Sequence, residues 1–147
     1  CICVSQPYPD DRLAAYLRLC GHDAASAIER GAEDADAVAA LARDEDRRVV
    51  TRSERLAGRT DGILLAQGGL DSRLRSLRAA GVDLTLADRP SRCGRCNGSL
   101  DPLHRDDPGP DYAPNGDAFD RWRCRDCTQL FWRGSHWDRV RERLAGL

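Results

Sequence analysis

Cys93-Gly94-Arg95-Cys96, answered by Cys124-Arg125-Asp126-Cys127, is the pattern around which this sequence is organised. It consists of two C-x-x-C pairs with the 27 residues 97–123 between them. Such pairs are typical of a structural zinc site, because one tight turn presents both sulfurs of a pair to one ion, and Zn²⁺ accepts four thiolates in a tetrahedron. We therefore predict that one zinc ion is bound by Cys93, Cys96, Cys124 and Cys127.

The same cysteines could instead form a redox site or a pair of disulfide bonds. A redox C-x-x-C motif is a single pair at the start of a helix, whereas here two pairs lie among turn-forming residues such as Asn97-Gly98. The spacing therefore favours zinc over the two alternatives. The chain has seven cysteines in all, and metal-bound or reduced thiols are typical of a reducing cytoplasm, where we expect the protein to be.

Length and charge narrow the class of protein. The chain has 147 residues and a formal net charge of −1, and all of its lysine-or-arginine cations are arginine. This length allows one domain with a small extension. The near-zero charge gives no overall attraction to nucleic acid or to an anionic membrane. No apolar run approaches the ~20 residues of a membrane-spanning helix, and we expect no membrane partner.

Residues 1–88 alternate short apolar runs with amphipathic segments. We predict strands at 1–4, 48–51 and 63–66, a weaker one within 22–28, and a last strand or extended link at 82–86. Helices are predicted at 12–20, 33–42, 53–57 and 70–80, because their apolar residues recur at helical spacing. This alternation is typical of an α/β fold, a mainly parallel sheet with helices on both faces.

Residues 89–147 have a different character, and we predict that they form a second domain, a zinc ribbon with a C-terminal helix. Segment 101–120 carries six aspartates and four prolines and is predicted to be a solvated loop. Segment 121–133 interleaves arginine with Trp122, Phe131 and Trp132. These aromatic residues could stack on nucleic-acid bases, or they could be the small core of the ribbon. The last helix is predicted to begin with Ser135 as its cap.

Five segments of this sequence together resemble one known family. They are 13–23, Val49-Val50-Thr51-Arg52, 91–98, Trp122-Arg123-Cys124 with Cys127, and Phe131-Trp132-Arg133-Gly134-Ser135-His136-Trp137. The family is the mutator-seven C-terminal RNase family, whose members couple a PIN-like nuclease domain to a C-terminal zinc ribbon. The resemblance covers nearly the whole chain and is most specific in the last segment. It implies a PIN-like sheet over residues 1–88 and metal-dependent hydrolysis of RNA.

The resemblance also implies where the catalytic carboxylates lie. Family members carry an aspartate after the first strand, acids opening the second helix, and an aspartate directly after the Thr-Arg of the third strand. These carboxylates hold Mg²⁺ or Mn²⁺, which activates water and stabilises charge on the phosphate. Here Pro7 stands at the first position and Ser53 at the third, while Glu33, Asp34 and Asp36 occupy the second. A rearranged catalytic site would use Asp10, Asp34, Asp36 and Glu54.

Three hypotheses follow from these residues. The first is a metal-dependent ribonuclease that uses the rearranged carboxylates. The second is an inactive relative that binds RNA through surface arginines, for which the candidates are Arg12, Arg18, Arg52, Arg121, Arg123 and Arg133. The third is an adaptor that binds another protein through its zinc ribbon. Because two of the three expected acidic positions are neutral, we predict an RNase-family protein that acts on or binds RNA, with weakened or absent catalysis.

Overall fold

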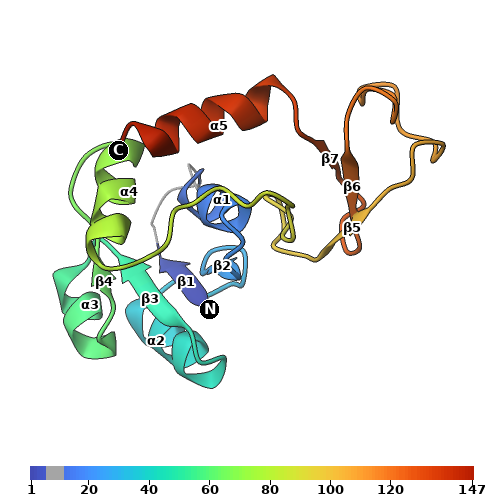
Figure 1. The fold of residues 1–147 in the computed structure, drawn as a ribbon. Helices are drawn as coiled ribbons and strands as arrows, with labels where there is room; N and C mark the ends of the chain where they lie inside the picture. The colour runs from blue at the N-terminus through green and yellow to red at the C-terminus, as the bar shows by residue number, and fades with distance from the viewer. Residues whose placement is uncertain (6–11) are drawn as a thin grey trace.

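Four short parallel strands form the sheet at the centre of the fold, in the order β2-β1-β3-β4. The computed structural model describes residues 1–5 and 12–147 (Figure 1). The strands are β1 Ile2–Ser5, β2 Ala24–Ser26, β3 Arg48–Thr51 and β4 Ile63–Leu64. The helices that follow them are α1 Arg12–Leu19, α2 Ala35–Asp44, α3 Glu54–Thr60 and α4 Leu70–Ala79.

Helices cover both faces of this sheet. Successive side chains of a strand point to opposite faces, so Val50 packs with α1 and α4 in one core while its neighbour Val49 packs with α2 and α3 in another. Leu17 and Leu74 are fully buried in the first core, and Val38 is buried in the second. The prediction of a parallel α/β sheet with helices on both faces is thus confirmed. Segment 82–86 forms no strand and is the extended link.

The ribbon is a separate antiparallel sheet with the order β5-β6-β7. Its strands are β5 Leu100–Pro102, β6 Arg121–Cys124 and β7 Leu130–Trp132. Trp122 is buried beside Leu100 and the cysteines, and Phe131 packs against this small core. Trp132 lies outside it and faces the ring of Tyr112, with centroids 6.3 Å apart. The core interpretation therefore holds for Trp122 and in part for Phe131.

The last helix, α5 Ser135–Ala145, leaves the ribbon and returns to the α/β body, as Figure 1 shows. Its buried side chains Trp137, Val140 and Leu144 belong to the same core as α1 and α4. We predicted this helix as part of the second domain, 89–147. In the structure, the apolar face of the helix packs into the core of the α/β body. Gly134 is the N-cap and provides no side-chain hydrogen bond, so the capping role expected for Ser135 is wrong.

The helices of the described residues are short. A helix needs about 20 residues to cross a bilayer. The longest described helix, α5, has 11 residues. Within the described residues no helix is long and apolar enough to span a membrane.

Candidate functional site

Four cysteine side chains meet at one end of the ribbon. Among the described residues, Cys93, Cys96, Cys124 and Cys127 are the only group of three or more His, Cys, Asp or Glu whose ligand atoms all lie within 4.8 Å of one another. The Sγ atoms are 3.6 Å apart for Cys93 and Cys127 and 3.5 Å apart for Cys96 and Cys124. These distances exclude a disulfide bond, in which the sulfurs are about 2.05 Å apart.

The cluster has the dimensions that one zinc ion requires. Four thiolates at the usual Zn–S length of about 2.3 Å stand about 3.8 Å apart at the corners of a tetrahedron. The observed sulfur separations of 3.5 and 3.6 Å are close to that value. Soft thiolates also select zinc over hard ions such as Mg²⁺. The four cysteines can therefore hold a zinc ion in a closed, structural site.

Each C-x-x-C pair opens a short turn, here called the first knuckle (93–98) and the second knuckle (124–129). In each, the residue after the second cysteine is left-handed, with φ 68° at Asn97 and φ 63° at Thr128. Its N–H donates to the carbonyl oxygen of the first cysteine, at 2.9 Å in the first knuckle and 3.1 Å in the second. The repeated turn explains how each pair presents both of its sulfurs to one point.

The surroundings of the cysteines shift the pKa values of their thiols in different directions. Burial raises the pKa of the Cys93 and Cys96 thiols. Burial also acts on Cys124, but hydrogen bonds from the backbone N–H groups of Cys127 and Asp126 outweigh it and lower the pKa of that thiol. Thiolates are the ligands of zinc, so binding displaces protons from the thiols with raised pKa and weakens as the pH falls.

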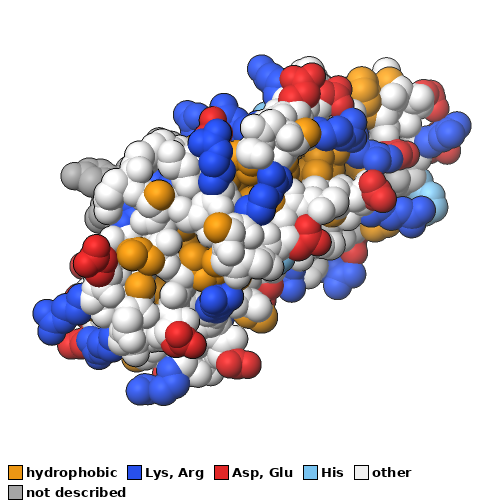
Figure 2. Space-filling model, turned by 60° about the vertical axis from the view of Figure 1, so that its left-hand side comes forward, with side chains coloured by type: hydrophobic (Ala, Val, Ile, Leu, Met, Phe, Trp, Pro, Cys, Tyr) orange, Lys and Arg blue, Asp and Glu red, His pale blue; other side chains and the backbone are white. Residues whose placement is uncertain are grey.

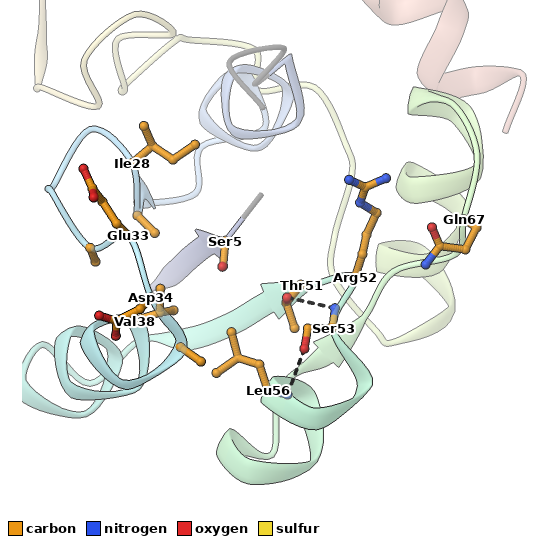
Figure 3. Close-up of a pocket in the computed structure, with 13 residues that line it drawn as sticks. Ser5, Ile28, Glu33, Asp34, Val38, Thr51, Arg52, Ser53, Leu56 and Gln67 are labelled. Atoms are coloured by element: carbon orange, nitrogen blue, oxygen red, sulfur yellow. Dashed lines mark hydrogen bonds between the residues drawn. The ribbon is translucent and has the colours of Figure 1, made fainter. Parts of the chain in front are cut away.

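A second site lies in the α/β body. A cleft of about 660 Å³ opens where the parallel strands end, and its lining includes Ser5 at the end of β1, Ile28 just after β2, and Thr51 at the end of β3 (Figure 3). The carboxyl ends of parallel strands are where α/β proteins place their ligands. The cleft is thus at the position expected for the nuclease site.

The structure describes three of the four predicted catalytic carboxylates; Asp10 lies outside the described residues. Asp34 lines the cleft, and its Oδ1 accepts a hydrogen bond of 2.8 Å from the N–H of Ala37, which caps α2. Asp36 pairs with Arg59 at 2.5 Å and is not among the cleft-lining residues. Glu54 is exposed in the first turn of α3 and likewise does not line the cleft.

Two of the described acidic residues line the cleft. Of the acids in the second family position, Glu33 and Asp34 line the cleft. No group of three carboxylates with oxygens within 4.8 Å of one another occurs among the described residues. Mg²⁺ is usually held by one or two carboxylates together with water and substrate phosphate oxygens, so Glu33 and Asp34 are the described side chains that could contribute to such a site.

Ser53 stands where the resemblance implies an aspartate, and its hydroxyl serves the fold. Its Oγ accepts a hydrogen bond of 3.2 Å from the N–H of Leu56 and so caps α3. Its own N–H donates to Oγ1 of Thr51 at 3.1 Å. The third family position therefore carries a helix cap without charge. Pro7, at the first family position, lies outside the described residues.

Arg52 brings a positive charge to the lining of the cleft. Its Nε–H is buried and has no hydrogen-bond partner among the described residues. A buried donor without an acceptor costs about 1–3 kcal/mol. Arg52 itself lines the cleft, so it remains among the RNA-binding candidates.

Two of the predicted RNA-binding arginines are not surface residues. Arg18 is 2 % exposed and Arg121 is 4 % exposed. The Nη2 of Arg121 donates to the backbone carbonyls of His104, Arg105 and Asp107 at 3.1, 3.1 and 2.8 Å, which fixes the aspartate-rich loop on the ribbon. Arg18 is engaged in the same way at the first knuckle. Neither side chain can reach an RNA backbone, and both assignments are corrected.

The three remaining candidates are more accessible. Arg12 is exposed at the start of α1. Arg123 donates to the carbonyl of Pro108 at 3.1 Å. Arg133 pairs with Asp120 at 3.1 Å, and its guanidinium carbon lies 5.8 Å from the centroid of the Trp122 ring. Figure 2 shows arginine and acidic side chains interspersed on one face of the molecule, so that face shows no broad cationic surface.

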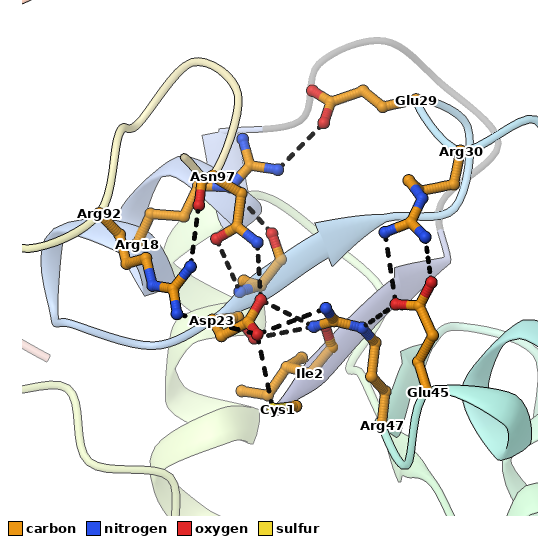
Figure 4. Close-up of polar contacts among 11 residues, drawn as sticks. Cys1, Ile2, Arg18, Asp23, Glu29, Arg30, Glu45, Arg47, Arg92 and Asn97 are labelled. Carbon is orange, nitrogen blue, oxygen red and sulfur yellow. Dashed lines mark hydrogen bonds and ion pairs between the residues drawn. The ribbon is translucent and has the colours of Figure 1, made fainter. Parts of the chain in front are cut away.

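A polar network between body and ribbon was not found by sequence reasoning. Asp23 accepts a hydrogen bond of 2.6 Å from Nδ2 of Asn97, 74 residues away, and pairs with Arg47 at 2.8 Å (Figure 4). Burial alone would raise the pKa of the Asp23 carboxyl, but the hydrogen bonds from Arg47 and Asn97 outweigh it and lower the pKa. Asp23 and Asn97 both lie in segments that resemble the family, 13–23 and 91–98. No local sequence pattern, however, reveals a contact between residues 74 positions apart.

Comparison with known proteins agrees with this architecture. No curated protein and no solved structure matched the chain. The family model described as the Mut7-C RNAse domain matches residues 11–144, which include the α/β helices, both knuckles and most of α5. The match spans most of the chain and includes the four clustered cysteines, so this protein belongs to the Mut7-C RNAse domain family.

Proposed function

We propose that this protein binds RNA in the cleft at the carboxyl ends of the sheet and cleaves it weakly or not at all. The observation that carries this proposal is the pair Arg52-Ser53 at the end of β3. An arginine with an unsatisfied buried N–H lines the cleft next to a neutral helix cap. A guanidinium recognises phosphate oxygens well, whereas a serine cannot supply the charge that holds a divalent cation.

The proposed RNA contacts are Arg52 in the cleft together with Arg12, Arg123 and Arg133. The cleft also offers the neutral polar side chains of Ser5 and Gln67. Such groups bind the sugar–phosphate backbone and so favour single-stranded RNA without strong sequence preference. In the same proposal a zinc ion in the cysteine cluster holds the two knuckles together and takes no part in any reaction.

Metal-dependent hydrolysis is the second candidate, favoured by membership of an RNase family. In it Asp34 and Glu33, with Asp10, would hold Mg²⁺ or Mn²⁺, and the ion would supply an activated water. An adaptor role is favoured by aromatic side chains on the ribbon's loop, where Tyr112 is 58 % exposed and Phe119 is 40 % exposed. All seven cysteines are free, which supports the proposal of a reducing cytoplasm.

Cleavage is tested with end-labelled single-stranded RNA in the presence of Mn²⁺ or of a chelator. We expect no Mn²⁺-dependent cleavage by the parent, and detectable cleavage by Ser53→Asp combined with Pro7→Asp. Ser53→Asn combined with Pro7→Asn is the matched control, because asparagine caps a helix as well as aspartate but carries no charge. Cleavage by the parent that disappears in Asp34→Asn, which keeps the α2 cap, would show that the site is active.

Binding is tested through its dependence on salt. Each phosphate neutralised by arginine contributes about 0.7 to the slope of log affinity against log salt for a single strand. We expect Arg52→Gln to lower both the affinity and this slope. Arg43→Gln is the control, since Arg43 is 79 % exposed on α2 and outside the cleft lining. An affinity that does not fall with salt would contradict the proposal, and no RNA binding at all would favour the adaptor.

A further inference from the structure

Arg18 lies buried between the sheet and the first knuckle. Its Nε donates to the carbonyl oxygen of Ala24, in β2, at 2.8 Å. Its Nη1 donates to the carbonyl oxygens of Gly94 and Arg95, at 3.0 and 3.2 Å. These two carbonyls lie between the cysteines of the first C-x-x-C pair. The guanidinium therefore holds the backbone that carries two zinc-ligand candidates.

The other end of the same guanidinium contacts the turn next to the cleft. Its Nη2 pairs with Glu29 at 3.0 Å (Figure 4). Glu29 follows Ile28, which lines the cleft together with Ala27. The turn that contains Glu29 is closed by backbone hydrogen bonds from Arg30 to Ser26 and from Gly31 to Ile28, at 3.1 and 3.0 Å. One side chain thus touches both the first knuckle and the turn that forms a wall of the cleft.

A second contact fixes the knuckle at the same edge of the sheet. The Oδ1 of Asn97 accepts a hydrogen bond of 3.1 Å from the N–H of Ala24, and its Nδ2 donates to Asp23. Ala24 is therefore bound to the knuckle through its N–H by Asn97 and through its carbonyl by Arg18. The two contacts leave the first knuckle little freedom to move independently of β2.

We propose that Arg18 is a positioning residue that couples the zinc site to the wall of the cleft. Bound zinc orders the first knuckle, the carbonyls of Gly94 and Arg95 hold Arg18, and Arg18 holds Glu29 and the turn beside it. Coupling between two sites is reciprocal, so a change at Glu29 alters the affinity for zinc. The inference rests on the zinc binding in the proposed function and is independent of RNA binding or cleavage.

Zinc affinity of the full chain, measured by competition with a chromophoric chelator, is the first test. We expect Arg18→Met to weaken zinc binding about tenfold, as loss of an outer partner of a metal site does. Glu29→Gln, in the turn beside the cleft, removes one half-exposed ion pair and is expected to weaken binding about two- to fivefold. Asp71→Asn is the matched control: Asp71 pairs with Arg143 at 2.9 Å and is 49 % exposed, against 48 % for Glu29.

Amide hydrogen exchange of the zinc-loaded protein, followed by NMR, is the second test. In Glu29→Gln the amides of Arg30 and Gly31 should exchange faster while those of β3 and α4 keep their rates. A role in stability alone would instead raise exchange throughout the sheet, and that result would overturn the proposal. Arg18→Lys, which keeps the charge but has fewer donors, should recover part of the zinc affinity lost in Arg18→Met.

Three results would contradict the coupling. They are a chain that binds no zinc, an unchanged zinc affinity in Glu29→Gln, and unchanged exchange at Arg30 and Gly31 in that variant. Glu29→Gln changes a half-exposed side chain, so the test remains decisive even where Arg18→Met fails to fold. Neither measurement contains RNA, so failure of the proposed RNA binding would leave its outcome unaffected.

Discussion

The glycine at the end of the first knuckle gives the sharpest test of the zinc site. A Cβ on Gly98 would come within 2.8 Å of the Sγ of Cys124 and would also clash with the carboxylate of Asp126. The Asp126 carboxylate is the end of a side chain and can move aside. The sulfur of Cys124 cannot, because it is one of the four zinc-ligand candidates. Gly98→Ala should therefore displace a ligand of the metal.

The magnitude follows from the size of the overlap. Adding one methyl group to a fully packed site costs about 1–3 kcal/mol. If the methyl group destabilises the zinc-bound protein but not the zinc-free protein, zinc affinity falls about 5- to 150-fold, since 1.4 kcal/mol is a factor of ten. Gly94→Ala is the control in the same turn, because a Cβ there meets only the Phe131 ring, at 4.0 Å.

The assay is competition for zinc against a chelator, with the charge-transfer bands of bound Co²⁺ as a check on four-thiolate coordination. We expect Gly98→Ala to lose affinity and to show altered Co²⁺ bands, while Gly94→Ala behaves as the parent does. Equal zinc affinities for Gly98→Ala, Gly94→Ala and the parent would refute the reasoning. In that case the cysteine cluster does not hold the metal in the observed geometry.

Three further outcomes are expected, each read from urea unfolding. Gly62→Ala should destabilise the fold by about 1–3 kcal/mol, because its Cβ would lie 2.7 Å from the carbonyl oxygen of Val49. Gly58→Ala is the control: this glycine lies inside α3 with open space around it, and the substitution should stabilise the fold by up to about 1 kcal/mol. Trp137→Ala should cost about 3–5 kcal/mol, since this side chain of α5 is 5 % exposed in the main core; a loss below about 1 kcal/mol would mean that α5 is not docked. The pKa of Asp23 is lower in the folded protein than in the unfolded chain, where it is about 3.9, so the ionised carboxylate stabilises the fold above that pH. This stabilisation is lost as the pH falls through the folded pKa, and the stability difference between the parent and Asp23→Asn should therefore shrink below about pH 4. A stability difference that does not change with pH would contradict the assignment.

The α/β body was predictable from sequence because its signals are local. The run Arg48-Val49-Val50-Thr51 became β3 without a change of boundary. The apolar spacing of Leu13 and Leu17 identified the buried face of α1, which the structure confirms. The docking of α5 could not be predicted, because an amphipathic pattern shows that a face is buried but not which body covers it.

Arg18 shows the same limit for a charged residue. Arginine is mostly exposed in proteins, so a surface role was the natural expectation. Its partners Gly94 and Arg95 are 76 and 77 residues away and are backbone carbonyls, which any residue type provides. Sequence alone carries no signal for such a contact. The cysteines differ because the spacing within each C-x-x-C pair is itself the signal, and their clustering in space follows from it.

Ser53 caps α3 without the negative charge of the aspartate that the resemblance implies at this position. Serine and aspartate cap helices about equally well, and Oγ of Ser53 already performs that task for α3. The free energy of folding is therefore nearly indifferent to which of the two residues follows Arg52, whereas affinity for a divalent cation depends on the charge. Stability and metal binding are separable at this position, so Ser53→Asp should leave the urea midpoint nearly unchanged. A large loss of stability in that variant would mean that the cleft does not tolerate a third carboxylate beside Glu33 and Asp34.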